Sequence, residues 1–318
     1  MSRPRPLYRL AFSVLLLAAL ANISTSVARA QKQESQPHLT PEEIRLYHKA
    51  QTLMDWTPEQ SHSRPELRKL RLAESQRALP VILRNVGETV AALFGNFPNT
   101  TSTEKVVAEV CSGGTGLCYV TARYSFRYLL VARVGAGTRF MSEYRTDEKG
   151  NPVDYEHLEY MPLLTSGFAS TALHFHPRNQ TFCRFRYFGR QKFRAQEAEV
   201  VGFAQMPDQN PPATGFAMGD RTAHLLVQGL TWIDARSHEI LHIQTDLLAP
   251  RPDVGLERQT TRIDFSAIHL PETSTAFWLP TQVMVDVWRF HRHFRNIHQY
   301  SDFKLFRVES RIGPVSEK

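Results

Sequence analysis

Two patterns of apolar and polar positions meet near residue 99. Between residues 40 and 98, apolar residues recur three or four positions apart, which is the spacing of helices with one buried face. Between residues 99 and 312, apolar and polar residues alternate singly between turns of Gly, Pro and Asn, as in antiparallel strands. Helices followed by about ten strands predict an α+β fold. We expect a highly curved antiparallel sheet with helices filling its concave side.

Start signals divide the helical segment into three helices. TPEE at 40–43 is a capping box with Pro at the first helical position, and SRPE at 63–66 repeats the arrangement. Pro80 interrupts the second helix, because proline lacks the backbone N–H that a helix interior needs. A third helix follows within 81–97, where one stripe holds Ile82, Val86, Val90 and Leu93.

The predicted strands carry aromatic and branched side chains on shared faces. In the strand near 119–133, for example, Phe126 and Tyr128 lie on one face. Such side chains exceed what a sheet with one covered face needs, so some of them are candidates for a ligand-binding face. The candidates are Phe126, Tyr128, Phe185, Val285 and Trp288. For each one singly, an ordinary core position is the competing interpretation.

The two ends of the chain have their own character. Basic residues, an apolar stretch at 10–21 and ARA at 28–30 make residues 1–30 a secretory signal peptide. The apolar stretch is short for a bilayer span, so we expect no transmembrane anchor after cleavage. The mature protein is therefore expected to be periplasmic or secreted. Residues 31–39 are a predicted disordered leader, and 313–318 form a polar tail.

Net charge argues against nucleic acid as a partner. The chain carries +7, and cleavage removes four arginines (3, 5, 9 and 29) and no acids, which leaves 7 − 4 = +3. This excess is spread along the chain without a Lys/Arg block of the kind that binds nucleic acid.

Cys111 and Cys118 are a disulfide candidate. They bracket the turn-forming sequence SGGTGL, and disulfides persist in export compartments. Spacing alone does not fix the geometry of a bridge, so an open pair is an equal alternative.

The third cysteine, Cys183, belongs to a predicted hairpin. Segment 181–190 is expected to pair with 195–206 through a turn near Gly189. Cys183 shares a strand face with aromatic neighbours there, which predicts a buried core thiol.

HEILH at 238–242 matches the H-E-x-x-H signature of zinc proteases. On a helix the two imidazoles lie about 6 Å apart and can share one ion. On a strand they lie ~13 Å apart and cannot. The flanking residues alternate as strands, and Thr245 and Leu248 occupy positions where a metzincin needs Gly and His. A hairpin is the favoured interpretation, and a zinc hydrolase requires a helix at 237–248.

A second histidine cluster comprises His291, His293 and His298. A surface metal site across a hairpin is one interpretation, and solvated imidazoles at a hairpin tip are the favoured one. The sequence has no G-x-S-x-G and no phosphate-binding Gly loop with its Lys. It therefore assigns no catalytic residue, no metal ligand and no cofactor.

The C-terminal half resembles a known family. WIDARSHEILHIQTDLLAP, TRIDFSAI, FWLPTQVMVDV and RNIHQYSDFKLFRVES form an ordered set of motifs, within about 180–310, similar to secreted bacterial proteins of the LolA-like lipoprotein-carrier superfamily. The resemblance implies an unclosed half-barrel whose apolar concave face is partly plugged by helices. It also implies a carrier of acyl chains without catalytic residues, and it places HEILH on a return strand. The N-terminal helices depart from that pattern.

The leading hypothesis is a non-enzymatic periplasmic protein that holds a lipid, lipoprotein acyl chain or other apolar group on the concave face. A cell-envelope interaction or sensor module, binding a protein partner through the same sheet, is the first alternative. The second is the zinc hydrolase that would use HEILH.

Overall fold

The computed structural model describes residues 39–306 apart from 113–115, 136–137, 154–166 and 219–220. The predicted signal peptide at 1–30, the leader up to residue 38 and the tail at 313–318 lie outside the described residues. They remain predictions.

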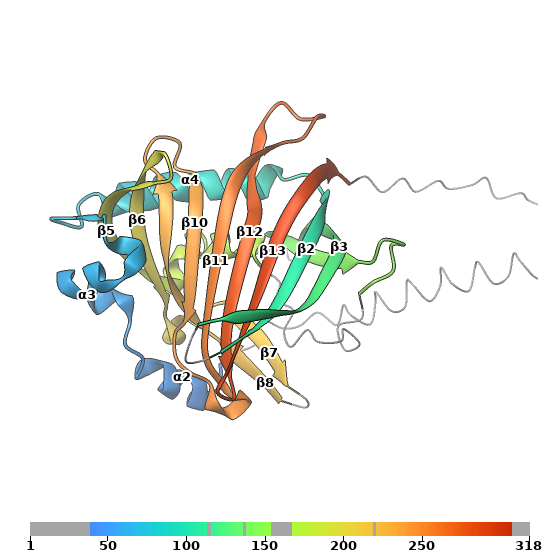
Figure 1. Ribbon diagram of the computed structural model, residues 1–318. Coiled ribbons are helices and arrows are strands. Elements are labelled where there is room, and N and C mark those ends of the chain that lie inside the picture. The colour runs from blue at the N-terminus through green and yellow to red at the C-terminus, as the bar shows by residue number, and fades with distance from the viewer. Residues whose placement is uncertain (1–38, 113–115, 136–137, 154–166, 219–220, 307–318) are drawn as a thin grey trace, which may run out of the picture. The chain divides into compact units, whose positions relative to one another are not determined.

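An 11-stranded antiparallel sheet dominates the described part, and it is strongly curved and not closed (Figure 1). Its order is β1-β5-β6-β9-β10-β11-β12-β13-β2-β3-β4, so β1 and β4 are the edges. The bounds are β1 Arg71–Leu72, β2 Thr100–Cys111, β3 Cys118–Gly135, β4 Thr138–Thr146, β5 Cys183–Phe193, β6 Gln196–Gln205, β9 Val227–Asp234, β10 Ile240–Leu247, β11 Leu256–His269, β12 Ala276–Arg289 and β13 Arg292–Leu305. Strands β7 Thr214–Met218 and β8 Arg221–Leu225 form a separate hairpin. The predicted α+β class with a curved antiparallel sheet is confirmed.

In the described part of the chain, three α-helices precede the long strands: α2 Pro41–His48, α3 Pro58–Ser63 and α4 Leu79–Asn96. The capping box at Thr40 is present, with the Thr40 side chain and Glu43 each accepting from the other's backbone N–H. Short 3₁₀ helices are η1 Leu53–Asp55, η2 Pro65–Leu67, η4 Ala169–Phe175, η5 Gln180–Phe182, η6 Pro207–Gln209 and η7 Pro252–Val254.

The prediction of a second helix from residue 63 was wrong. The capping box in use is six residues earlier, at Thr57 with Gln60, and α3 ends at Ser63. The following residues make only the single turn η2, because the chain then enters the sheet edge as β1. Tertiary strand pairing therefore outweighs the local helix signal. Pro80, expected to break a helix, lies in the first turn of α4, where its missing N–H costs nothing.

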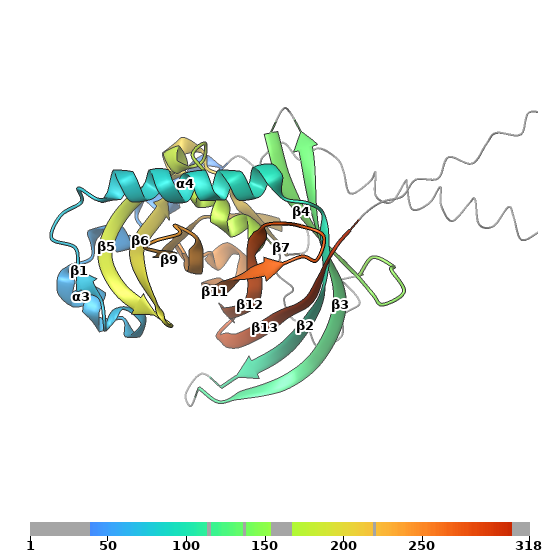
Figure 2. The ribbon, with the colours of Figure 1, turned by 90° about the horizontal axis from the view of Figure 1, so that it is seen from above.

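The helices cover both faces of the sheet, which corrects the expectation that all of them fill the concave side. Helix α4 packs on the concave face, where Val86 and Phe94 join the core formed by Val201 and Val285. Helix α2, η1 and η2 pack on the convex face in a second apolar cluster around Trp232. In Figure 2, α4 lies across the open side of the curved sheet and contacts both β5 and β4.

The β5–β6 hairpin turns later than predicted. Gly189 lies inside β5, and the turn falls after Phe193, where Arg194 has φ of 53°. Gly189 has φ of 134°, and a Cβ there would lie 1.9 Å from the carbonyl oxygen of Arg71. This glycine therefore does not make the turn but lets β1 approach β5 at a bulge.

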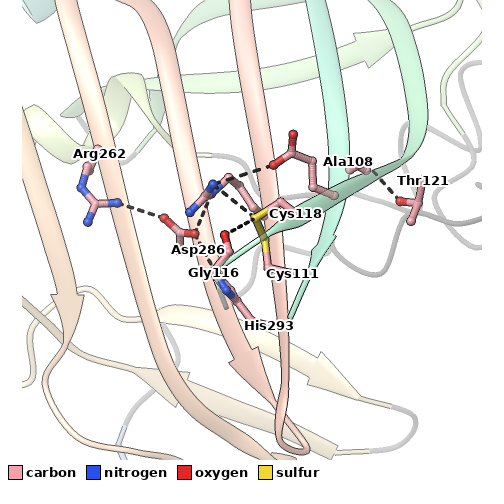
Figure 3. Close-up of a disulfide and its surroundings, with 10 residues drawn as sticks. Ala108, Cys111, Gly116, Cys118, Thr121, Arg262, Asp286 and His293 are labelled. Carbon is pink, nitrogen blue, oxygen red and sulfur yellow. Dashed lines mark hydrogen bonds and ion pairs between the residues drawn. A yellow bond between two sulfur atoms is a disulfide. The ribbon is translucent and has the colours of Figure 1, made fainter. Parts of the chain in front are cut away.

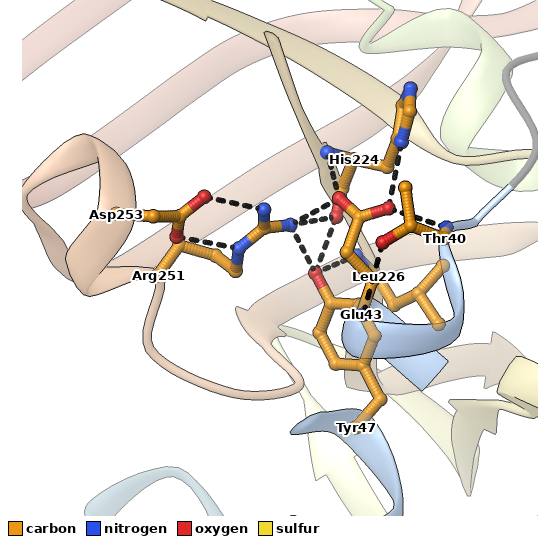
Figure 4. A network of polar contacts seen from close by, with 7 residues as sticks. All are labelled: Thr40, Glu43, Tyr47, His224, Leu226, Arg251 and Asp253. Carbon is orange, nitrogen blue, oxygen red and sulfur yellow. Dashed lines mark hydrogen bonds and ion pairs between the residues drawn. The ribbon is translucent and has the colours of Figure 1, made fainter. Parts of the chain in front are cut away.

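A buried polar network fixes α2 against β8 and η7 (Figure 4). Glu43 accepts hydrogen bonds from Arg251 Nη1 at 2.9 Å and from the backbone N–H of His224 at 3.0 Å. Tyr47 donates to the carbonyl of His224, and Arg251 also binds Asp253 through two hydrogen bonds. Burial acts to raise the pKa of Glu43, but hydrogen bonds from His224 and Thr40 lower it to about 2. The N-terminal helix is thereby tied to the β7–β8 hairpin.

Candidate binding face

The concave face is built by strand alternation. In β12, Val283, Val285 and Val287 lie in the concave core, and their sequence neighbours point to the other face. Because every strand of the sheet curves around this side, its apolar residues converge on one continuous core. That core is the binding face under consideration.

Four of the five candidate ligand-binding residues lie on this face. Tyr128 and Val285 are core residues with 5% and 1% exposure, and Phe126 is buried two positions before Tyr128 on the same strand face. Phe185 packs against the core, with its ring centroid 5.4 Å from that of Phe175. Trp288 lies on the convex face instead, between the guanidinium of Arg258 and the ring of His293.

Separate elements cover the concave face. Phe175 of η4 packs on Phe203 of β6 at a centroid distance of 5.8 Å, and Phe216 of the β7–β8 hairpin joins the same core. Helix α4 is held to the η4–η5 segment by Gln180, whose Nε2 donates to the carbonyls of Leu83 and Phe175. None of these covering elements is paired with the 11-stranded sheet as an additional strand. Side-chain packing, rather than a backbone ladder, therefore holds them in place.

A small pocket of about 120 Å³ lies beside the turn between β5 and β6. Its lining includes Phe193, Leu241 and Trp278. Drug-sized ligands occupy clefts of roughly 300–1,000 Å³, so this pocket is too small for a lipid.

A buried ionic cluster interrupts the apolar concave face, and sequence analysis missed it. Glu104 on β2 is fully buried and receives two hydrogen bonds from Arg145, at 2.5 and 2.8 Å. His298 Nδ1 and Tyr300 Oη lie 2.8 Å from the same carboxylate. Burial acts to raise the pKa of Glu104, but the hydrogen bonds from Arg145 and His298 lower it to about 2. Glu104 is therefore a carboxylate.

A second acid extends this cluster. The carboxylate of Glu143 accepts from the backbone N–H groups of Gly167 at 2.7 Å and Ala169 at 3.1 Å. Burial raises the pKa of Glu143 in spite of these bonds. The Tyr128 hydroxyl donates a hydrogen bond to Glu143, and the Arg145 guanidinium lies 5.6 Å from the centroid of the Tyr128 ring. Strand alternation, visible in the sequence, places Glu104 on the same concave face as Val106. The residues of β4 and β13 that bind Glu104 could not be predicted from the sequence.

HEILH lies on a turn and a strand. His238 is in the β9–β10 turn with φ of 61°, and its Nε2 lies 3.2 Å from Asn85 Nδ2 on α4. His242 is on β10, with Nδ1 2.7 Å from Asp264 Oδ1. The helix that a zinc site requires at 237–248 is absent, and β10 begins at Ile240. The favoured hairpin interpretation is correct.

The disulfide candidates are bonded in the structure, and they lie at the convex surface (Figure 3). Cys111 and Cys118 face each other across the β2–β3 pair. Beside them, Arg295 donates to Cys118 Sγ at 3.4 Å and to Asp286 at 2.8 Å. Glu109 lies close enough to both sulfurs to suggest a metal site, but the sulfurs are bonded to each other and offer no thiolate.

The predicted histidine cluster does not exist as a unit. His291 is 95% exposed at the β12–β13 turn, as the hairpin-tip interpretation expects. His293 binds the buried carboxylate of Asp286 on the convex side at 2.7 Å. His298 is fully buried on the concave side. Strand alternation separates the last two, because they are an odd number of positions apart.

Comparison with known proteins gives distant structural neighbours. A candidate outer membrane lipoprotein-sorting protein domain from Vibrio parahaemolyticus matches with a TM-score of 0.40 and 11% identity, over 70% of this chain and 91% of that one. A DUF1329 family protein from Desulfovibrio piger matches at 0.38 and 10%, over 73% and 95%. A LolA superfamily protein from Nitrosomonas europaea matches at 0.34 and 13%, over 71% and 94%. No protein-family model and no curated protein matches the chain.

One of these neighbours is titled a LolA superfamily protein, and the C-terminal motifs resemble that superfamily. Identities of 10% to 13% carry no information on function. Among the described residues, no helix is long and apolar enough to cross a membrane.

Proposed function

We propose that the chain is an exported, non-enzymatic binding protein that holds an apolar group, such as an acyl chain, on the concave face of its sheet. The observation that carries the proposal is the apolar concave core covered by elements outside the sheet's hydrogen-bond ladder. A carrier must be able to expose and close its apolar face, and covering elements held by side-chain contacts can separate from the sheet without breaking strand pairing.

Helix α4 is the cover that moves in this proposal. The β7–β8 hairpin is fixed by the buried Glu43–Arg251 network, which would be costly to break. Helix α4 instead rests on apolar contacts and on bonds such as Gln180 to Leu83. Val285 is 1% exposed, so a ligand reaches it only when a covering element is displaced, and α4 is the element proposed to move.

Native mass spectrometry of the mature protein, residues 31–318, purified from a periplasmic extract is the first test. We expect a retained adduct of several hundred daltons that detergent disperses, and delipidated protein should take up pyrene, an apolar fluorescent probe. A bare polypeptide mass together with no pyrene uptake would refute the proposal.

A pair of glycine variants tests the role of α4. A Cβ at Gly87 would lie 2.8 Å from Gln180 Nε2 and 3.2 Å from the carbonyl oxygen of Phe175, so Gly87→Ala displaces the Gln180 amide that connects α4 to η4. A Cβ at Gly95 meets nothing within 4 Å, so Gly95→Ala makes the same chemical change without the clash. We expect pyrene to dissociate faster from Gly87→Ala and at the wild-type rate from Gly95→Ala. Equal rates in both variants would show that α4 is not the cover.

A further inference from the structure

The protonation of His298 is fixed by its partner. Its Nδ1 lies 2.8 Å from Glu104 Oε1, and that carboxylate also accepts from Arg145 and Tyr300. A carboxylate only accepts hydrogen bonds, so Nδ1 must carry the proton and donate it. Burial lowers the pKa of His298 against the raising effect of Glu104, which leaves the ring neutral. The other ring nitrogen, Nε2, is then an acceptor with a free lone pair.

That acceptor is buried without a donor. His298 has 0% exposure, and Nε2 has no hydrogen-bond partner among the residues that the structure describes. The edge of the ring meets Phe168, at a centroid distance of 5.0 Å, so an apolar residue stands next to it. Buried polar atoms are nearly always paired in native proteins, so an unpaired one calls for a partner, and an ordered water, an ion or a ligand atom can supply it.

The charges around the ring limit what that ligand atom is. Arg145 is committed to Glu104 through two hydrogen bonds, so its charge is neutralised within the cluster. Glu143, 2.7 Å from the Gly167 N–H, adds a second acid rather than a cation. An anionic head group would meet the Nε2 lone pair here while Arg145 is already paired with Glu104, so desolvating the anion would be costly.

We propose that His298 Nε2 accepts a hydrogen bond from a neutral donor, a hydroxyl or a secondary amide N–H, on the apolar ligand of the concave face. The inference rests on the proposed function and names the class of ligand: an acyl or alkyl chain with a neutral donor, in preference to a fatty-acid anion. His298 is the residue that selects this class.

Two amides that differ by one N–H test the inference. N-methyldodecanamide has the donor and N,N-dimethyldodecanamide lacks it, and each is measured by displacement of pyrene from the delipidated mature protein. In His298→Asn, the asparagine amide keeps a donor near the Nδ1 position for Glu104 but removes Nε2. The matched control is His242→Asn, which makes the same change at a carboxylate-bound histidine on the convex face.

We expect the ratio of the two dissociation constants to fall about tenfold in His298→Asn, which is about 1.4 kcal/mol, and to stay unchanged in His242→Asn. Dodecanoate should bind more weakly than dodecanol to the wild type. An unchanged ratio in folded His298→Asn would overturn the inference and leave the proposed function standing. Failure of every ligand to displace pyrene would overturn both.

A measurement on the wild type tests the inference even if His298→Asn does not fold. Nitrogen-15 NMR of labelled histidine reports the Nδ1–H form directly and the state of Nε2 on titration. We expect the Nε2 resonance of His298 to move with N-methyldodecanamide and to stay in place with the dimethyl amide. A resonance that shows a proton on Nε2 before any ligand is added would overturn the assignment.

Discussion

Removing Arg145 is the most direct perturbation of the concave face. Arg145→Met keeps most of the aliphatic stem but leaves Glu104 fully buried without its cation. Breaking a buried ion pair from one side costs about 3–5 kcal/mol in unfolding free energy. The pKa of Glu104 gives an independent magnitude, because it is about 2 in the folded protein against an ordinary 4.5. That difference contributes about 3 kcal/mol at neutral pH.

The sign of the pH dependence follows from the lowered pKa. The contribution of Glu104 is fully present above pH 4.5 and is lost as the pH falls through 2. The loss caused by Arg145→Met should therefore be large at pH 7 and clearly smaller at pH 3. Denaturant unfolding followed by tryptophan fluorescence at the two pH values measures both losses.

The double variant Glu104→Gln, Arg145→Met is the matched control. It removes both charges, so we expect it to recover most of the stability lost in Arg145→Met, with a coupling of about 2–3 kcal/mol. A loss below about 1 kcal/mol at pH 7, against the 3–5 kcal/mol of a broken buried pair, would refute the reasoning. So would a loss that is the same at pH 3 and pH 7.

Three further outcomes follow from single features. Replacing Cys111 and Cys118 by Ser opens a short loop and should lower the unfolding free energy by about 2 kcal/mol, measured against the wild type with its disulfide formed. Burial and Asp234 raise the pKa of Glu239 to about 7, so its contribution to stability is lost as the pH rises from 4.5 through 7. The melting temperature of Glu239→Gln should therefore exceed that of the wild type at pH 8 and match it at pH 4. Burial raises the pKa of Cys183 to about 12, so a thiol reagent should modify it only under denaturing conditions, and rapid labelling of the native protein would contradict its burial.

The sequence was sufficient to predict an element where the pattern that specifies the element is local. The stripe of Ile82, Val86 and Val90 predicted the buried face of α4, and alternation around HEILH predicted the β9–β10 hairpin. Alternation also places Val285 and Trp288 on opposite faces of the sheet, because they are an odd number of positions apart. Applying alternation strictly would have removed Trp288 from the candidate binding face.

Long-range partners explain what the sequence could not predict. Nothing near residue 65 indicates that Arg71 pairs with Arg190, which is why the second helix was misplaced. The Glu104 cluster joins β2, β4 and β13, and no local pattern links residues so far apart along the chain. Buried charged residues in strands are rare, so an acid at an inward position is the one signal that was available.

The two edges of the sheet differ in length, and the difference bears on self-association. Strand β1 has two residues and offers almost no template, whereas β4 extends over nine, Thr138–Thr146. Of these two terminal strands, β4 is the longer template for a second copy. Two copies that pair through their β4 strands cover both β4 edges and form a two-fold dimer. Association through β4 should therefore end at a dimer.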